Sequence, residues 1–78
     1  MVLLEPRSDF DKCVIGVIYA EDRAVYDTDM VIETFMRINE WSYEEALEWF
    51  EYNTLRSLPY LDQEDAPVFM SKDFELED

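Results

Sequence analysis

The chain has 78 residues, of which 20 are acidic and 6 are basic, so its formal net charge at pH 7 is −14. This charge opposes direct binding to nucleic acid and to anionic membranes, because both depend on basic protein side chains. The sequence has no histidine and one cysteine, Cys13, which excludes an intramolecular disulfide, histidine-based catalysis and a zinc site with several thiolates.

The size of the chain predicts one small domain with a modest core. Its first apolar stretch, Met1–Leu4, is followed at once by Glu5 and Pro6 and is too short for a signal peptide. No stretch approaches the ~20 apolar residues that a membrane-spanning helix requires. We therefore expect a cytoplasmic protein without a membrane anchor, and the sequence indicates no cofactor.

The first third of the chain predicts an arm followed by a β-hairpin. Residues 1–12 are expected to form a flexible N-terminal arm, because Pro6 and Asp9 interrupt any regular element. Cys13–Ala20 is an apolar run rich in β-branched side chains, which favours a strand buried on both faces. After a polar turn, Ala24–Tyr26 is predicted to be a second, antiparallel strand.

Two helices are predicted next. The segment Asp27–Asp29 offers an N-cap for a helix over Met30–Asn39. The longest predicted helix covers Trp41–Leu58, and Ser42 followed three residues later by Glu45 is a capping box at its start. Because the connection between the two helices is short, we expect them to pack as an αα-hairpin.

A last apolar run, Pro67–Met70, predicts the third strand. We expect it to pair beside Cys13–Ala20, which would make that strand central and account for its unbroken apolar character. The order β-β-α-α-β predicts an α+β fold, a small two-layer domain in which a three-stranded sheet is packed by the αα-hairpin. This single domain would span residues 13–70, and residues 71–78 would form an acidic C-terminal tail.

Between Ala24 and Met70 the chain carries the stretches AVYDTDMVIETFM, WSYEEALEWFEYNT and APVFM. Together they resemble a group of small, acidic, uncharacterised proteins from bacteria and their bacteriophages. The group has no assigned activity, so the resemblance implies no functional residue. It implies a phage origin, and with it the host cytoplasm as the location.

A row of glutamates is the main candidate site. Glu44, Glu48 and Glu51 follow i, i+4, i+7 spacing, so they share one face of the predicted helix and repeat about every 5–6 Å along its axis. Such a row is typical of a solvated outer face or of a surface that attracts cations. The candidate partner-binding face consists of Glu33, Glu44, Glu48, Glu51, Asp62, Glu64 and Asp65. Trp49 and Tyr52 would be an aromatic anchor for a partner if they were exposed beside these glutamates.

Other residues that often carry chemistry favour structural roles. Cys13 opens an apolar run and has no histidine nearby, so we expect a buried, unreactive thiol. Asn53 falls on the apolar face of the longest helix and is expected to hold the Tyr60–Pro67 loop by hydrogen bonds. The segment Asp27–Asp29 lacks the remaining ligands and the glycine of a calcium-binding loop, so no metal site is predicted.

The sequence leaves two functions open. The first is a non-enzymatic acidic protein-binding module that occupies the basic surface of a nucleic-acid-binding host protein, as a DNA mimic of the anti-CRISPR or anti-restriction inhibitor type. The alternative is a small structural or assembly protein, acting as a homodimer or an accessory subunit, in which the charge serves solubility. An enzyme is not expected, because the usual catalytic residues are missing.

Overall fold

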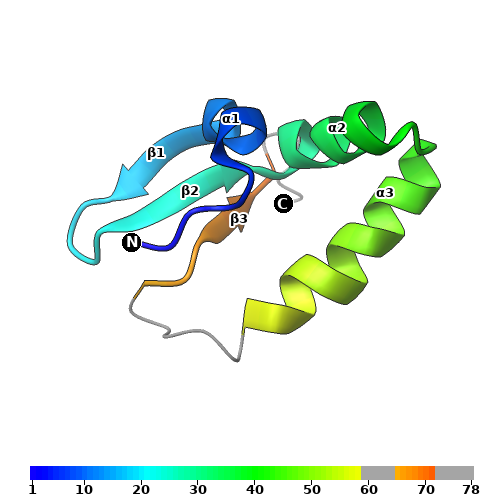
Figure 1. Ribbon diagram of the computed structural model, residues 1–78. Coiled ribbons are helices and arrows are strands. Elements are labelled where there is room, and N and C mark those ends of the chain that lie inside the picture. The colour runs from blue at the N-terminus through cyan, green and yellow to red at the C-terminus, as the bar shows by residue number, and fades with distance from the viewer. Residues whose placement is uncertain (59–64, 72–78) are drawn as a thin grey trace, which may run out of the picture.

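The computed structural model describes residues 1–58 and 65–71. It shows a small α+β domain with a three-stranded mixed sheet, and it confirms the β-β-α-α-β order (Figure 1). The strands are β1 (Val14–Ile18), β2 (Arg23–Asp27) and β3 (Val68–Met70). The helices are α1 (Arg7–Phe10), the 3-10 turn η1 (Asp11–Cys13), α2 (Thr28–Asn39), α3 (Tyr43–Trp49) and the π-helical segment η2 (Phe50–Leu55), which continues α3.

The central strand of the sheet is β2, and β1 lies at an edge. β1 runs antiparallel to β2, with Val17 opposite Ala24. β3 runs parallel to β2 on its other side, with Val25 opposite Val68. The prediction that the third strand pairs beside residues 13–20 is therefore wrong.

The burial of the side chains explains why β2 is central. Ala24 and Tyr26 are completely buried and alternate along β2, as expected for a strand with one face against the core. Gly16 and Val17 of β1 are exposed. The prediction that Cys13–Ala20 is a strand buried on both faces is therefore wrong. The helices α2 and α3 supply the long crossover that a parallel pair of strands requires.

Residues 1–12 belong to the packed domain. The side chain of Phe10 at the end of α1 is 2% exposed, and its ring centre is 5.1 Å from that of Phe35 on α2. The backbone N–H of Leu4 donates a hydrogen bond to the Tyr26 hydroxyl at 2.8 Å. The expectation that Pro6 and Asp9 interrupt any regular element is therefore wrong, because Arg7–Phe10 form α1. The flexibility of residues 1–12 stays a prediction. Of the predicted C-terminal tail, residues 72–78 lie outside the described residues.

The two longer helices form the predicted αα-hairpin. α2 begins at Asp27, whose carboxylate accepts the N–H of Met30 at 3.2 Å, and it ends at Glu40 in the left-handed conformation. The capping box of α3 is confirmed, because the Ser42 hydroxyl accepts the Glu45 N–H at 3.2 Å and the Glu45 carboxylate accepts the Ser42 N–H at 3.1 Å. The first turn of each helix is thus capped by the side chain of its N-cap residue, Asp27 for α2 and Ser42 for α3.

We expect Ser42→Ala to lower the free energy of unfolding by about 1 kcal/mol, because an N–H in the first turn of α3 loses its acceptor. Urea unfolding followed by circular dichroism measures this change. Ser42→Asn keeps an acceptor at the cap and is the matched control, with an expected loss of about 0.3 kcal/mol or less. Equal losses in the two variants would mean that the cap does not stabilise α3.

The core joins the sheet, α1, α2 and α3. Its fully packed side chains are Phe10, Cys13, Ala24, Tyr26, Val31, Ile32, Ala46 and Phe50. Phe50 meets Phe69 of β3 edge to face, with ring centres 5.0 Å apart. Cys13 is fully buried with its sulfur 3.5 Å from the Thr34 hydroxyl, which confirms the prediction of a buried thiol.

Candidate functional site

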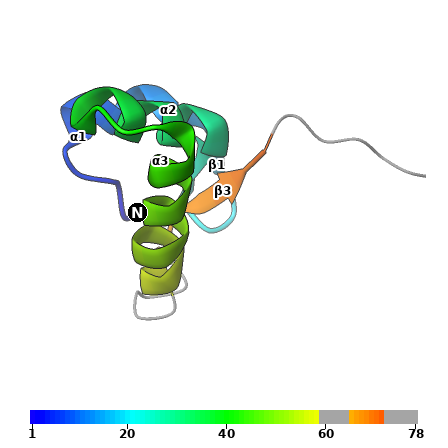
Figure 2. The ribbon, with the colours of Figure 1, turned by 90° about the vertical axis from the view of Figure 1, so that its right-hand side faces the viewer.

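The helix formed by α3 and η2 has one buried and one exposed side. Its inner side carries Ala46 and Phe50, which are 0% and 2% exposed. Glu44, Glu48 and Glu51 are exposed and, from their spacing, lie on the outer side. Figure 2 views the molecule from the side of α3, which stands in front of the strands. The three predicted glutamates therefore share one solvent-facing surface, which we refer to as the α3 face.

Ion pairs lie elsewhere in the molecule. The described arginine pairs are Arg7–Asp11 at 3.2 Å, Arg23–Glu21 at 3.6 Å and Arg37–Asp9 at 3.9 Å. None of the ion pairs within residues 1–58 and 65–71 involves a side chain of α3 or η2. Among the described residues, the carboxylates of the α3 face therefore have no ion-pair partner.

An open groove of about 420 Å³ runs along the same helix. Its lining residues are Trp41, Glu45, Glu48, Trp49, Tyr52 and Asn53, and we refer to it as the α3 groove. The ring centres of Trp41 and Trp49 are 5.3 Å apart, with the ring planes at 45°. Trp49 is 46% exposed and Tyr52 is 55% exposed. The condition set for an aromatic anchor, exposure of both rings beside the glutamates, is thus met.

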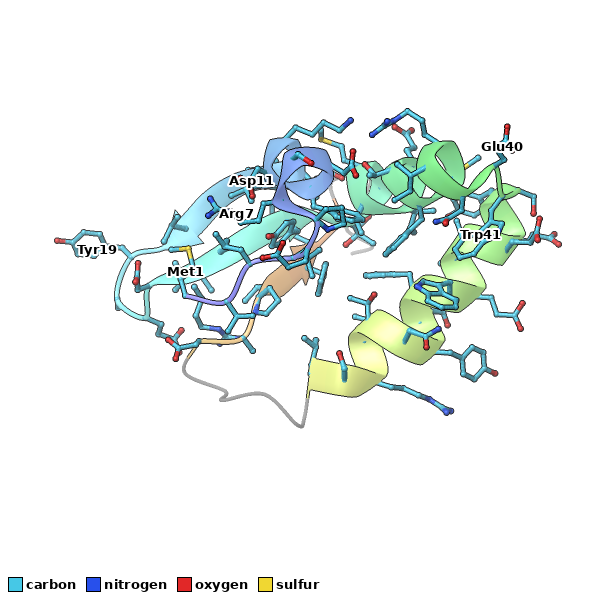
Figure 3. The ribbon with its side chains drawn as sticks, viewed as in Figure 1. Met1, Arg7, Asp11, Tyr19, Glu40 and Trp41 are labelled. Carbon is cyan, nitrogen blue, oxygen red and sulfur yellow. The ribbon has the colours of Figure 1, made fainter. Side chains whose placement is uncertain are left out.

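The two tryptophans of the groove differ in how closely they pack against the rest of the domain. Trp41 follows Glu40 at the connection between α2 and α3, where Glu40 points outward to solvent (Figure 3). Trp41 also packs against the core, whereas Trp49 is more exposed. The ring of Trp49 therefore lies against that of the better-packed Trp41.

A cation already rests on an aromatic ring of the groove. The Arg56 guanidinium carbon lies 4.6 Å from the centre of the Tyr52 ring, which is a cation–π contact. Arg56 takes part in none of the ion pairs found in the described part of the chain. Aromatic faces next to carboxylates can bind positive groups by charge and by ring polarity together.

The other predicted acidic residues come from different places. Glu33 is exposed on α2 and lines a separate hollow. The Asp65 carboxylate lies 3.4 Å from the ammonium group of Met1. Asp62 and Glu64 lie outside the described residues. The structure thus brings Glu48 together with Trp49 and Tyr52 in the α3 groove. Glu44 and Glu51 are exposed on the same helix outside the groove lining, and Glu33 and Asp65 lie away from it.

Asn53 has a different place from the one predicted. It is exposed in the groove, and its side-chain amide donates to the Trp49 carbonyl at 3.2 Å. The wider π-helical turn of η2 displaces Asn53, which lies near the end of this segment, from the face that a regular helix would give it. Trp41 and Glu45 were missed as groove residues, although the i, i+4, i+8 spacing from Trp41 to Trp49 places them on one stripe.

Comparison of the chain with protein-family models, curated proteins and solved structures gives no match. The resemblance to small bacterial and phage proteins therefore stays a prediction. Within residues 1–58 and 65–71, no group of three or more histidine, cysteine, aspartate or glutamate side chains is arranged to hold a metal ion. In the same part of the chain, none of the helices has the length and apolar character needed to cross a membrane.

Proposed function

We propose that this chain is a non-enzymatic protein-binding module that docks its α3 face on a basic surface of another protein. The observation that carries the proposal is the separation of charges within the domain. Glu44, Glu48 and Glu51 share one exposed side of a helix, while the described arginine ion pairs are made by other elements. Uncompensated charge of one sign attracts a complementary surface and speeds association with it.

The finer form of the proposal is competition with nucleic acid. Proteins that bind nucleic acid present basic side chains to the phosphates, so their binding surfaces suit an acidic helix. The glutamates repeat about every 5–6 Å along α3, compared with ~3.4 Å for phosphates along one DNA strand. The α3 face therefore resembles a sparse row of phosphates, and the chain would act as an inhibitor of the anti-CRISPR or anti-restriction type in a host cytoplasm.

Capture from a host lysate, followed by elution with DNA, tests this function. The immobilised chain is incubated with lysate at low salt, and bound proteins are released by high salt or by a mixed-sequence DNA duplex. We expect nucleic-acid-binding proteins among those released by both treatments, because salt and phosphates compete for the same basic surface. Retention of no such protein at low salt would refute the proposal.

Two charge-matched variants show whether the α3 face is responsible. The face variant is E44Q/E48Q/E51Q, and the control is E5Q/E21Q/D22N, on the exposed N-terminal segment and the hairpin turn. Each removes three negative charges. We expect the face variant to bind the captured partner about tenfold more weakly, and the control to change affinity by less than about twofold. Equal losses would mean that net charge, rather than this face, determines binding.

The exposed apolar groups on α3 favour the structural alternative as the second candidate. Trp49 and Tyr52 are about half exposed, and Leu55 in η2 is 38% exposed. Apolar surface of this kind is common where copies of a chain associate. Sedimentation velocity at low and high salt separates the two functions. A dimer that persists at high salt and is lost in Trp49→Ala would support the homodimer over the acidic module.

A further inference from the structure

We propose that the α3 groove binds an arginine side chain of the basic partner. The guanidinium group would stack on the exposed face of Trp49 and donate hydrogen bonds to the Glu48 carboxylate. This inference rests on the proposed function, because it names the side chain that the partner brings to the acidic helix. The shape of the groove, its charge and the contact of Arg56 support it independently.

The geometry of the tryptophan pair determines where a cation can lie. Ring centres 5.3 Å apart leave no space for a guanidinium group between Trp41 and Trp49, because stacked groups need about 3.5 Å on each side. The available surface is the outward face of Trp49, which is 46% exposed. Because the Trp49 ring lies against that of Trp41, it would lose less conformational freedom than an isolated ring when a ligand stacks on it.

The carboxylate available to such a ligand is that of Glu48. In the capping box, one oxygen of Glu45 already accepts the Ser42 N–H at 3.1 Å. Glu48 lines the groove, and none of the hydrogen bonds or ion pairs between described residues occupies its carboxylate. A carboxylate with two open oxygens can accept the paired N–H groups of a guanidinium.

Arginine suits this groove better than lysine. A guanidinium group is planar and weakly hydrated, so it can stack on a ring while its edge donates to a carboxylate. A lysine ammonium is compact and strongly hydrated, and it gains less from an aromatic face. The chain contains an example of the ring contact alone, because the Arg56 guanidinium carbon lies over the Tyr52 ring, 4.6 Å from its centre.

Peptide titration followed by NMR tests the inference. The probes are three capped pentapeptides, GRGRG, GKGKG and the citrulline counterpart of the first. The chain has two tryptophans and both line the groove, so the two indole N–H signals report directly on it. We expect saturable shifts with the arginine peptide, binding about fivefold weaker with the lysine peptide, and no shift with neutral citrulline. Equal binding of arginine and lysine would overturn the inference.

Two single variants with the same charge change locate the site. Glu48→Gln alters the groove, whereas Glu51→Gln alters the α3 face beside it. We expect Glu48→Gln to weaken binding of the arginine peptide about fivefold and Glu51→Gln to change it by less than about twofold. Equal effects would overturn the inference. Both residues are exposed, and circular dichroism verifies that each variant folds.

The outcome for the groove can be separated from the outcome for the proposed function. If a basic protein is captured and Glu48→Gln weakens its binding no more than Glu51→Gln does, the groove inference fails and the proposed function stands. If the arginine peptide binds at the tryptophans and no basic protein is captured, the proposed function fails and the arginine site stands. Failure of both experiments overturns both statements.

Discussion

Phe50→Ala is expected to lower the free energy of unfolding by about 3–5 kcal/mol, which is the typical loss when a buried phenylalanine is truncated. Phe50 is 2% exposed and meets Phe69 edge to face, with ring centres 5.0 Å apart. The residue thus joins η2 to β3, two elements that come from opposite sides of residues 59–64. A domain of this length has a total stability of about 4–12 kcal/mol, so the variant would be partly unfolded at room temperature.

Urea unfolding followed by circular dichroism measures this loss. Phe50→Leu retains most of the buried volume, so it should remain folded and lose about 1–2 kcal/mol. Tyr52→Ala is the control on the outer side of the same helix, and we expect a loss of less than about 1 kcal/mol because Tyr52 is 55% exposed. Equal effects at positions 50 and 52 would contradict the packing of η2 against β3.

Tyr26→Phe is expected to lower the free energy of unfolding by about 1–3 kcal/mol, although it removes one oxygen atom. The Tyr26 side chain is completely buried, and its hydroxyl accepts the Leu4 N–H at 2.8 Å. The variant leaves that N–H without an acceptor and loosens the segment before α1. Tyr19→Phe is the matched control, because Tyr19 is 99% exposed and points away from the hairpin (Figure 3). Faster amide exchange at Leu4 in Tyr26→Phe alone would identify the broken bond.

Alkaline pH should weaken the wild-type fold through the same group. Burial raises the pKa of Tyr26 above its ordinary value of 10.0, and the Leu4 N–H offsets part of this effect. Because the folded state holds this proton more tightly, the contribution to stability is complete below about pH 10 and is lost as the pH rises through the folded pKa. Unfolding free energies measured between about pH 8 and about pH 11 should fall more steeply for wild type than for Tyr26→Phe. Equal slopes would contradict the assignment.

The types of most elements could be predicted because local signals determine them. Ser42 and Glu45 form the cap that starts α3, and Asp27 caps α2. The strand order depends instead on contacts between distant residues. Val25 pairs with Val68, and nothing in the sequence near either residue decides whether β3 joins β1 or β2. The apolar run was therefore sufficient to predict that β1 is a strand, but not that it lies at the edge of the sheet.

The N-terminal segment shows the limit of periodicity. Phe10 is a lone aromatic residue between Asp9 and Asp11, so no repeating apolar pattern predicts its burial. Its place is determined by Phe35 of α2, which lies 5.1 Å away between ring centres. The burial of a single core residue on a short helix can be predicted only when its neighbours in space are known.

The candidate site was predictable in its charges and less so in its aromatic part. The spacing of Glu44, Glu48 and Glu51 is sufficient to place them on one side of a helix. The exposure of Trp49 and Tyr52 depends on which neighbouring elements leave that side open, and large aromatic residues are more often found in cores. The π-helical segment, which changes the face of Asn53, has no recognisable sequence signal.

The parallel pairing of β2 and β3 has a consequence for how the protein is made. Until residues 68–70 leave the ribosome, the sheet consists of β1 and β2 alone, and a two-stranded hairpin is marginally stable in water. The rings of Phe50 and Tyr26 then lack Phe69, which contacts both in the finished domain. The nascent chain therefore exposes this apolar surface until β3 joins the sheet, and its high negative charge keeps such chains apart.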